Sequence, residues 1–155
     1  MDTASEKRQR GGRRSASAEE TAFLDLLRTC DFLTRGMVGL LKAADLSTTQ
    51  YNVLRILRGA QTPLTCGEIA GRLITRDPDT TRLLDRLEKR GLIARSREGK
   101  DRRVVLTRIT AEGSALLAEL DGPVREGHRK QLGHLGAEGL QKLRELLRAA
   151  RGEDA

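Results

Sequence analysis

The fold is decided by the stretch DPDTTRLLDRLEKRGLIARSREGKDRRVVLTRIT, which covers residues 77–110. Its first part repeats leucines at helical spacing, and its second part contains two β-like runs, 92–97 and 102–109, around the turn 98–101. A short helix with outward arginines followed at once by a basic hairpin is typical of a winged helix-turn-helix, in which one element enters the major groove and the other meets the backbone or minor groove. Binding to duplex DNA is therefore the first hypothesis.

The helix of this stretch is predicted to begin at Pro78. Asp77 would cap it, and Pro78 would occupy the first helical position, where its missing N–H costs nothing. Gly91 is expected at C′, just past the end of the helix. Helical periodicity then places an inner set (Thr80, Leu83, Leu84 and Leu87) and an outer set (Asp79, Thr81, Arg82, Asp85, Arg86 and Lys89) on opposite faces.

Two segments of the stretch, LLDRLEKRGLI at 83–93 and DRR at 101–103, closely resemble the MarR family of bacterial transcription regulators. The resemblance covers roughly residues 46–113. It implies a homodimeric repressor whose DNA affinity falls when a small phenolic or anionic ligand enters a crevice between the dimer helices and the DNA-binding lobe. Tyr51 and Arg55 are the candidate ligand contacts in this chain, and the alternative for Tyr51 is a place in the core or at a hinge.

The segments before the stretch read as three helices. A long amphipathic helix is predicted over residues 18–44. Ser47 with Gln50, and Thr65 with Glu68, have the spacing of capping boxes that open the next two helices. The second of these would be the first helix of the helix-turn-helix.

The segments after the stretch read as two more leucine-rich helices. Gly122-Pro123 is predicted to kink or break the first, and the last is expected to begin at about Ala137. With the first long helix they carry apolar stripes that predict a dimer interface, since helix-turn-helix proteins commonly pair two reading heads on a pseudo-palindrome. The alternative is packing within one chain.

The fold class expected is mainly α with a small β-hairpin wing, a winged helix-turn-helix flanked by dimerisation helices. The predicted layout is a disordered basic tail over 1–17 and a single winged helix domain over 18–155. Within that domain the DNA-binding lobe would cover 46–110 and the dimerisation helices 18–45 and 111–155. The tail carries five Lys and Arg side chains, which predict either a solvated tail or an arm along DNA phosphates.

Charge supports an anionic partner. The chain has a formal net charge of +7, and residues 64–110 hold 12 Lys and Arg against 7 Asp and Glu, so most of the excess lies on the proposed reading head. No apolar run reaches the length of a signal peptide or a membrane span, which leads us to expect a cytoplasmic protein.

The sequence offers little for an enzyme. His128 and His134 have no partner carboxylate pattern, and there is no metal-ligand spacing or glycine-rich phosphate loop. We therefore expect no catalytic residues, no metal and no cofactor. Cys30 and Cys66 do not form a CxxC or Cys/His cluster, so buried inert thiols are expected; the alternative is that one of them senses peroxide.

On the predicted recognition helix, Arg82 is the candidate for reading bases, and Arg86 for bases or phosphates, because a guanidinium makes bidentate contacts with either. The alternative for both is an ion pair on the helix surface. Thr81 could touch a phosphate or a thymine methyl group. Asp79 stands where MarR relatives usually have a small hydroxyl residue, and it could accept from a cytosine amino group or favour the N-terminal helix dipole.

On the predicted wing, the family resemblance implies that Arg102 enters the minor groove and that Arg103 pairs structurally or contacts a phosphate. Asp101 would orient one of these two arginines by a charge-assisted bond. The alternative is a solvated turn. Further phosphate contacts are expected from Arg95, Arg97 and Lys100.

The function expected from all of this is a sequence-specific DNA-binding transcriptional regulator: a homodimeric repressor released from a pseudo-palindromic operator by a small aromatic or anionic molecule. One alternative is a repressor that senses redox state through cysteine. The other is a protein-interaction adaptor built on a winged helix, which would not need cations such as Arg82 and Arg102 on both reading elements.

Overall fold

The computed structural model describes residues 16–97 and 104–153, and it divides the chain at residue 32 into two units. Residues 16–32 hold the first part of helix α1 (Ala18–Lys42), whose side chains are exposed there. The unit from Leu33 onward holds the rest of α1 and every other element. The described part of the chain is mainly helical with a small sheet, as the sequence predicted.

The central helix of the second unit is α4 (Thr80–Lys89), the recognition helix of the sequence prediction. Its predicted inner face is buried, and the four side chains on it are Thr80, Leu83, Leu84 and Leu87. Gly91 has a φ of 70°, and the amides of Gly91 and Leu92 donate to the carbonyls of Glu88 and Leu87. This is a Schellman motif, so the predicted C′ role of Gly91 is confirmed.

The predicted start of α4 at Pro78 is wrong by two residues. The Asp77 carboxylate accepts from the Asp79 amide at 2.8 Å, which folds Asp77 to Asp79 into a turn before the helix. Asp79 then caps the helix by accepting from the Arg82 amide at 3.3 Å. Asp77 and Asp79 could each cap the helix. Because the Asp77 carboxylate is bonded within the turn, Asp79 is the residue that caps α4.

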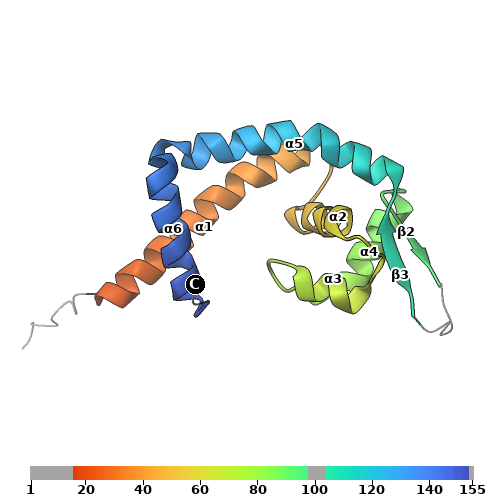
Figure 1. Cartoon of the computed structure of the whole chain (residues 1–155), viewed down its shortest axis with the longest axis horizontal. Helices are drawn as coiled ribbons and strands as arrows, with labels where there is room; N and C mark the ends of the chain where they lie inside the picture. The colour runs from red at the N-terminus through yellow and green to blue at the C-terminus, as the bar shows by residue number, and fades with distance from the viewer. Residues whose placement is uncertain (1–15, 98–103, 154–155) are drawn as a thin grey trace, which may run out of the picture. The chain divides into compact units, whose positions relative to one another are not determined.

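A three-stranded antiparallel sheet lies beside α4 (Figure 1). Strands β2 (Ile93–Ser96) and β3 (Leu106–Ile109) form the predicted hairpin, with Ile93 opposite Ile109. A third strand, β1 (Leu64–Thr65), pairs with the other edge of β3 and was not predicted from the sequence. Its pairing places β3 in the middle, where Thr107 is buried.

Both predicted capping boxes are present. Ser47 and Gln50 cap α2 (Thr48–Gly59), and Thr65 and Glu68 cap α3 (Cys66–Arg72), with reciprocal side-chain and backbone bonds in each case. The apolar faces of these helices join α4 and the sheet in one core. Its most buried side chains are Leu41, Val53, Leu54, Ile69, Leu84, Leu87, Ile93 and Leu117.

Helix α5 (Ala111–Leu132) leads away from the sheet as one continuous helix (Figure 1). Of the predicted kink or break at Gly122-Pro123, the break is wrong, since Pro123 lies inside the helix, and the kink stays a prediction. Leu120 and Val124 are buried on either side of it, and their packing offsets the hydrogen bond that proline cannot donate. A short 3₁₀ turn, Gly133–Leu135, then leads into α6 (Gly136–Ala150), close to its predicted start.

The start of α5 is locked to the end of α4. Thr110 caps α5 by accepting from the Gly113 amide at 3.0 Å, and its hydroxyl donates to the Gly91 carbonyl at 2.6 Å. Its amide donates to the Leu92 carbonyl at 3.2 Å. Gly113 packs so closely that an added Cβ would lie 2.2 Å from the same Leu92 oxygen. The recognition helix, the wing and α5 therefore meet at one tight junction.

Arg90 makes a second connection, which the sequence did not predict. Its guanidinium donates to the backbone carbonyls of Ala44 and Asp45, which follow the end of α1. Asp45 there has a φ of 52°, a conformation that few side chains tolerate, and the Leu46 amide returns to the Leu41 carbonyl. The end of α4 is thus fastened to the turn between α1 and α2.

Gly113→Ala should destabilise the fold by about 1–3 kcal/mol, because the new methyl group overlaps a backbone oxygen that cannot rotate away. The matched control is Gly71→Ala in α3, where nothing lies within 4 Å of the added Cβ and helix propensity should leave stability equal or raise it by up to about 1 kcal/mol. Urea unfolding followed by circular dichroism measures both. Equal stability of the two variants would contradict the tight junction.

Candidate nucleic-acid interface

The outer face of α4 is open to solvent. Thr81, Arg82, Arg86 and Lys89 are exposed, as the helical pattern predicted. Arg82 Nη1 lies 3.6 Å from Asp79 Oδ2, but the Arg82 side chain keeps 71% of its surface exposed. Within the described residues Arg86 has no ion pair within 4 Å. Both guanidinium groups are therefore available to an anionic partner.

Asp79 has two roles in the structure itself. Its Oδ1 accepts from the Arg82 amide and its Oδ2 faces the Arg82 guanidinium. The first contact supports the cap and dipole interpretation of this residue over a direct contact with cytosine. The base contact stays a prediction.

Thr81 lies beside the start of α3. Its hydroxyl is 3.8 Å from the Cys66 sulfur, a weak contact that joins the two helices of the helix-turn-helix. Thr81 nevertheless remains exposed, and Cys66 is half-buried. The outer side of Thr81 is therefore free to approach a phosphate or a methyl group.

The described part of the wing presents Arg97 at its end, exposed and beyond the last residue of β2. The predicted wing contacts Lys100, Asp101, Arg102 and Arg103 lie outside the described residues. Their assigned roles stay predictions. The strands on either side of them are antiparallel neighbours, so the chain returns to the sheet after residue 103 as a hairpin requires.

Arg95 has a different environment from the phosphate contact that was predicted for it. Its Nε donates to Glu88 at 2.8 Å, its Nη2 bonds both Glu88 and Asp85, and its amide also donates to Glu88 at 3.2 Å. The hydrogen bonds from Arg95 hold the pKa of Glu88 below its ordinary value, and the same bonds raise that of Arg95. The guanidinium is thus committed to two carboxylates of α4.

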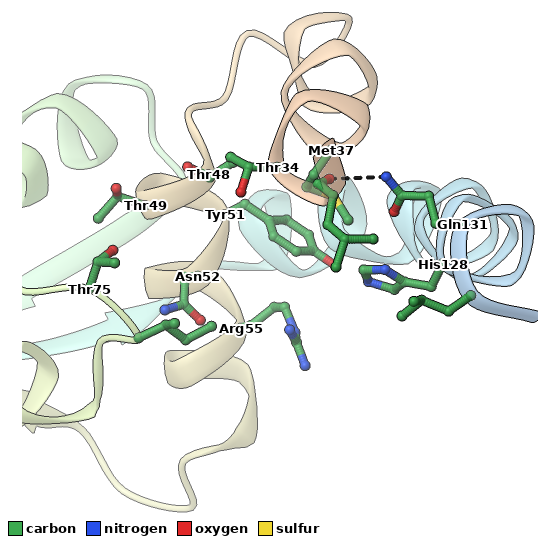
Figure 2. A pocket seen from close by; sticks show the side chains of 13 residues that line it. Thr34, Met37, Thr48, Thr49, Tyr51, Asn52, Arg55, Thr75, His128 and Gln131 are labelled. Carbon is green, nitrogen blue, oxygen red and sulfur yellow. Dashed lines mark hydrogen bonds between the residues drawn. The ribbon is translucent and has the colours of Figure 1, made fainter. Parts of the chain in front are cut away.

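A separate cavity of about 410 Å³ lies between the later part of α1, α2, the α3–α4 connection and α5. Figure 2 shows Tyr51, Asn52 and Arg55 on α2, with His128 and Gln131 on α5 across from them. Gln131 Nε2 donates to the Leu33 carbonyl of α1 at 3.0 Å, and its amide fills the space that a side chain at Gly36 would need.

The lining of this cavity is mainly apolar, and it contains the guanidinium group of Arg55. The Arg55 guanidinium carbon lies 5.8 Å from the centroid of the Tyr51 ring, a cation–π contact, and Arg55 is exposed. The described lining contains no Asp or Glu. Tyr51 is itself buried, so its predicted place in the core is confirmed while it also lines the cavity.

An ion pair joins α2 to α5. Arg58 Nη1 and Nη2 each donate to Asp121 at 2.8 Å, a bidentate arrangement. The bonds from Arg58 lower the pKa of Asp121, and the charges of Arg125 and Arg55 lower it further. Three arginine charges thus act on this one carboxylate.

Two further residues that the sequence analysis singled out are exposed to solvent. Cys30 is exposed, so its expected burial is wrong, because every described side chain of α1 up to residue 32 is exposed. His134 is exposed in the 3₁₀ turn. In the part of the chain that the structure describes, no three His, Cys, Asp or Glu side chains gather as metal ligands. None of its described helices combines the length and apolar character needed to cross a membrane.

Sequence reasoning missed the roles of Arg90 and Gln131, the carboxylate partners of Arg95 and the contribution of α5 to the cavity. Only Arg95 left a usable signal: strand alternation places it on the same side of β2 as the buried Ile93, and so toward α4. The other contacts join segments 45 to 98 residues apart, and no local pattern marks them.

The structure has a short helix, α3, then a capped helix with an open cationic face, α4, and then an antiparallel hairpin. This order and this exposed face define a winged helix-turn-helix DNA-binding protein. Comparisons with known proteins agree. The MarR family model matches residues 46–105. The HTH-type transcriptional regulator FarR of Neisseria gonorrhoeae is 32% identical over 117 residues, which are 75% of this chain and 80% of FarR. The homoprotocatechuate degradative operon repressor of Escherichia coli is 30% identical over 109 residues, 70% of this chain and 72% of the repressor.

Solved structures lead to the same family. A MarR transcription factor from Planctomyces limnophilus is 41% identical with a TM-score of 0.68, and the match covers 86% of this chain and 98% of that one. A mutant of Escherichia coli MarR complexed with operator DNA is 25% identical with a TM-score of 0.76, covering 84% and 93%. The chain belongs to the MarR family of DNA-binding transcriptional regulators.

Proposed function

We propose that this regulator is a homodimeric repressor that reads a pseudo-palindromic operator with α4 and the wing. The observation that carries the proposal is the open cationic face of α4, where Arg82 and Arg86 are exposed while the leucine face is buried. Arg82 would read base edges, and Arg86, Thr81, Arg97 and Lys100 would contact phosphates or neighbouring bases. Arg102 would enter the minor groove, with Asp101 and Arg103 supporting it.

Repression is supported by a relative. The Escherichia coli protein named homoprotocatechuate degradative operon repressor shares 30% identity with this chain over most of both lengths. Binding that covers an operator blocks access to it, so a DNA-binding regulator can repress without any further activity. We propose the same direction of control here.

Dimerisation is supported by apolar surface that the single chain leaves uncovered. In residues 16–32, Phe23, Leu27 and Phe32 of α1 are each more than half exposed. In the second unit, Leu146 of α6 is 70% exposed. Phe23 and Leu27 lie one turn apart on α1, and neighbouring exposed apolar side chains of this kind are suited to being covered by a partner. We propose that residues 18–45 and 111–155 supply the dimer helices and 46–110 the DNA-binding lobe.

The cavity beside α2 is the proposed effector site. Its apolar walls suit an aromatic ring, and Arg55 suits an acidic group, because no carboxylate in the described lining competes for that cation. Ile74 and Thr75, on the connection that leads into α4, also line the cavity. A ligand there would touch the segment that sets the start of the recognition helix, which gives it a route to change DNA affinity.

Arg82→Ala should relax sequence preference. On a duplex selected from a random pool by the wild-type protein, binding should weaken by about 5-fold to 150-fold, the value of one bidentate base contact, with little change on mixed-sequence DNA of the same length. Wild-type affinity for the selected duplex should be on the order of 10 nM at moderate salt. Fluorescence anisotropy over a salt series measures both.

The matched control is Arg97→Ala, an exposed arginine of the wing. It should weaken binding to both duplexes by a similar factor and reduce the slope of log affinity against log salt by about 0.9. Equal losses on both duplexes for Arg82→Ala would remove its base-reading role.

Light scattering should give the mass of two chains, and a single-chain mass with full DNA affinity would contradict the dimer.

Benzoate should release the selected duplex, whereas benzamide, which has the same ring without the charge, should not. Arg55→Gln should raise the benzoate concentration needed for release by roughly tenfold, the loss of one charge-assisted hydrogen bond. DNA affinity without ligand should stay unchanged, since Arg55 lies on α2 away from the reading face. Equal potency of benzoate and benzamide would refute the anionic effector site.

A further inference from the structure

Arg95 connects the two elements that meet DNA. It lies on β2, the first strand of the wing, and its guanidinium reaches Asp85 and Glu88, which lie nearly one turn apart on α4. Nε and Nη2 of the guanidinium and the backbone amide of the same residue all donate to these carboxylates. One residue therefore holds a strand to a helix through both its main chain and its side chain.

Of the three side chains in this contact, that of Arg95 is the least exposed. The Arg95 side chain keeps only 23% of its surface exposed, less than Asp85 at 44% or Glu88 at 37%. A planar guanidinium with two carboxylates on fixed elements has little freedom to reorient, which gives it more influence than a single exposed ion pair. Arg97, two residues further along the wing, is exposed by contrast.

The charges matter as much as the geometry. Asp85 and Glu88 lie on the helix that is proposed to enter the major groove, where free carboxylates would repel phosphates. Glu88 has its pKa lowered chiefly by the hydrogen bond from Arg95, so it stays ionised and paired. Arg95 thus offsets negative charge on the reading helix while it sets the position of the wing.

We propose that Arg95 is a positioning residue for DNA recognition, which clamps wing strand β2 to Asp85 and Glu88 of α4 so that the two reading elements keep a fixed separation and the carboxylates of α4 are neutralised. This inference rests on the proposed DNA-reading function. It assigns Arg95 to the architecture of the reading head, in place of the direct phosphate contact that the sequence suggested.

A phosphate contact and a clamp at Arg95 predict opposite effects of Glu88→Gln on the DNA affinity of the wild-type protein. If Arg95 contacted a phosphate, Glu88→Gln would remove a repulsive charge and strengthen DNA binding equally with Arg95 or with Ala at position 95. With the clamp, Glu88→Gln weakens binding in the wild-type protein because it loosens the wing. The same change strengthens binding in Arg95→Ala, where the unpaired Glu88 carboxylate is only repulsive.

The experiment measures affinity of the full chain for the duplex selected by the wild-type protein and for mixed-sequence DNA, by anisotropy over a salt series. Four proteins form the cycle: wild type, Arg95→Ala, Glu88→Gln and the double variant. Arg95→Ala should weaken binding to the selected duplex by about tenfold, with the salt slope unchanged. Its hydroxyl-radical footprint should lose protection under the wing and keep it under α4.

Arg95→Lys guards against a variant that fails to fold. Lysine keeps the charge but cannot bridge two carboxylates in the planar geometry of arginine, so the clamp predicts a loss close to that of Arg95→Ala. A phosphate contact would instead survive in the lysine variant. Thermal unfolding of each protein confirms that binding is measured on folded chains.

The clamp is refuted if Glu88→Gln strengthens binding by the same factor in both backgrounds, if Arg95→Ala lowers the salt slope by about 0.9, or if Arg95→Lys binds like the wild type. These outcomes differ from failure of the proposed function. If the proposed DNA-reading function is wrong, the wild-type protein will select no duplex from the pool, and the clamp proposal will be wrong as well.

Discussion

The structure depends on one constraint: α4 has a single apolar face, and that face must be buried. Leu83, Leu84 and Leu87 pack into the core with α2, α3 and the sheet, so the opposite face has nowhere to lie but in solvent. The arginines on that face are presented by the same packing that stabilises the fold. Burial of three leucines, worth roughly 1.5–3 kcal/mol each, therefore aims the recognition helix.

The orientation of α4 is fixed further at its C-terminal end. Three contacts meet at Leu92, which follows the end of α4. The Leu92 amide completes the Schellman motif of Gly91, and the Leu92 carbonyl accepts from the amide of Thr110, the cap of α5. Gly113 packs closely against the same carbonyl. Arg90 adds a bond to the turn after α1. A displacement of α5 or of the end of α1 is consequently felt at α4, and both helices line the cavity beside α2. These contacts are the route by which the proposed effector in this cavity would change the position of α4.

Sequence reasoning succeeded where the signal was local. Helical leucine spacing, the two capping boxes and Gly91 predicted the helices and the end of α4, because each pattern involves residues only a few positions apart. The family resemblance, carried by the segments at 83–93 and 101–103, was confirmed by the comparisons.

It failed where distant segments or competing local bonds decide. Strand β1 is two residues long and exists only because β3 pairs with it. The start of α4 depended on whether Asp77 folds a turn or caps a helix, and Pro123 was tolerated because its neighbours are buried. The partners of Arg95 and Gln131 come from other elements, so periodicity showed the face of Arg95 but not the carboxylates it meets.

The most direct test of the account replaces Thr81, on the outer face of α4, by the photocrosslinking residue benzoylphenylalanine and irradiates the protein with its selected duplex. Arg144, exposed on α6, is the control position. The account predicts crosslinks from position 81 to bases inside the footprint and none from position 144, at a salt concentration that suppresses non-specific binding. Equal crosslinking from both positions, or crosslinking from position 144 alone, would contradict the claim that packing of the leucine face aims α4 at DNA.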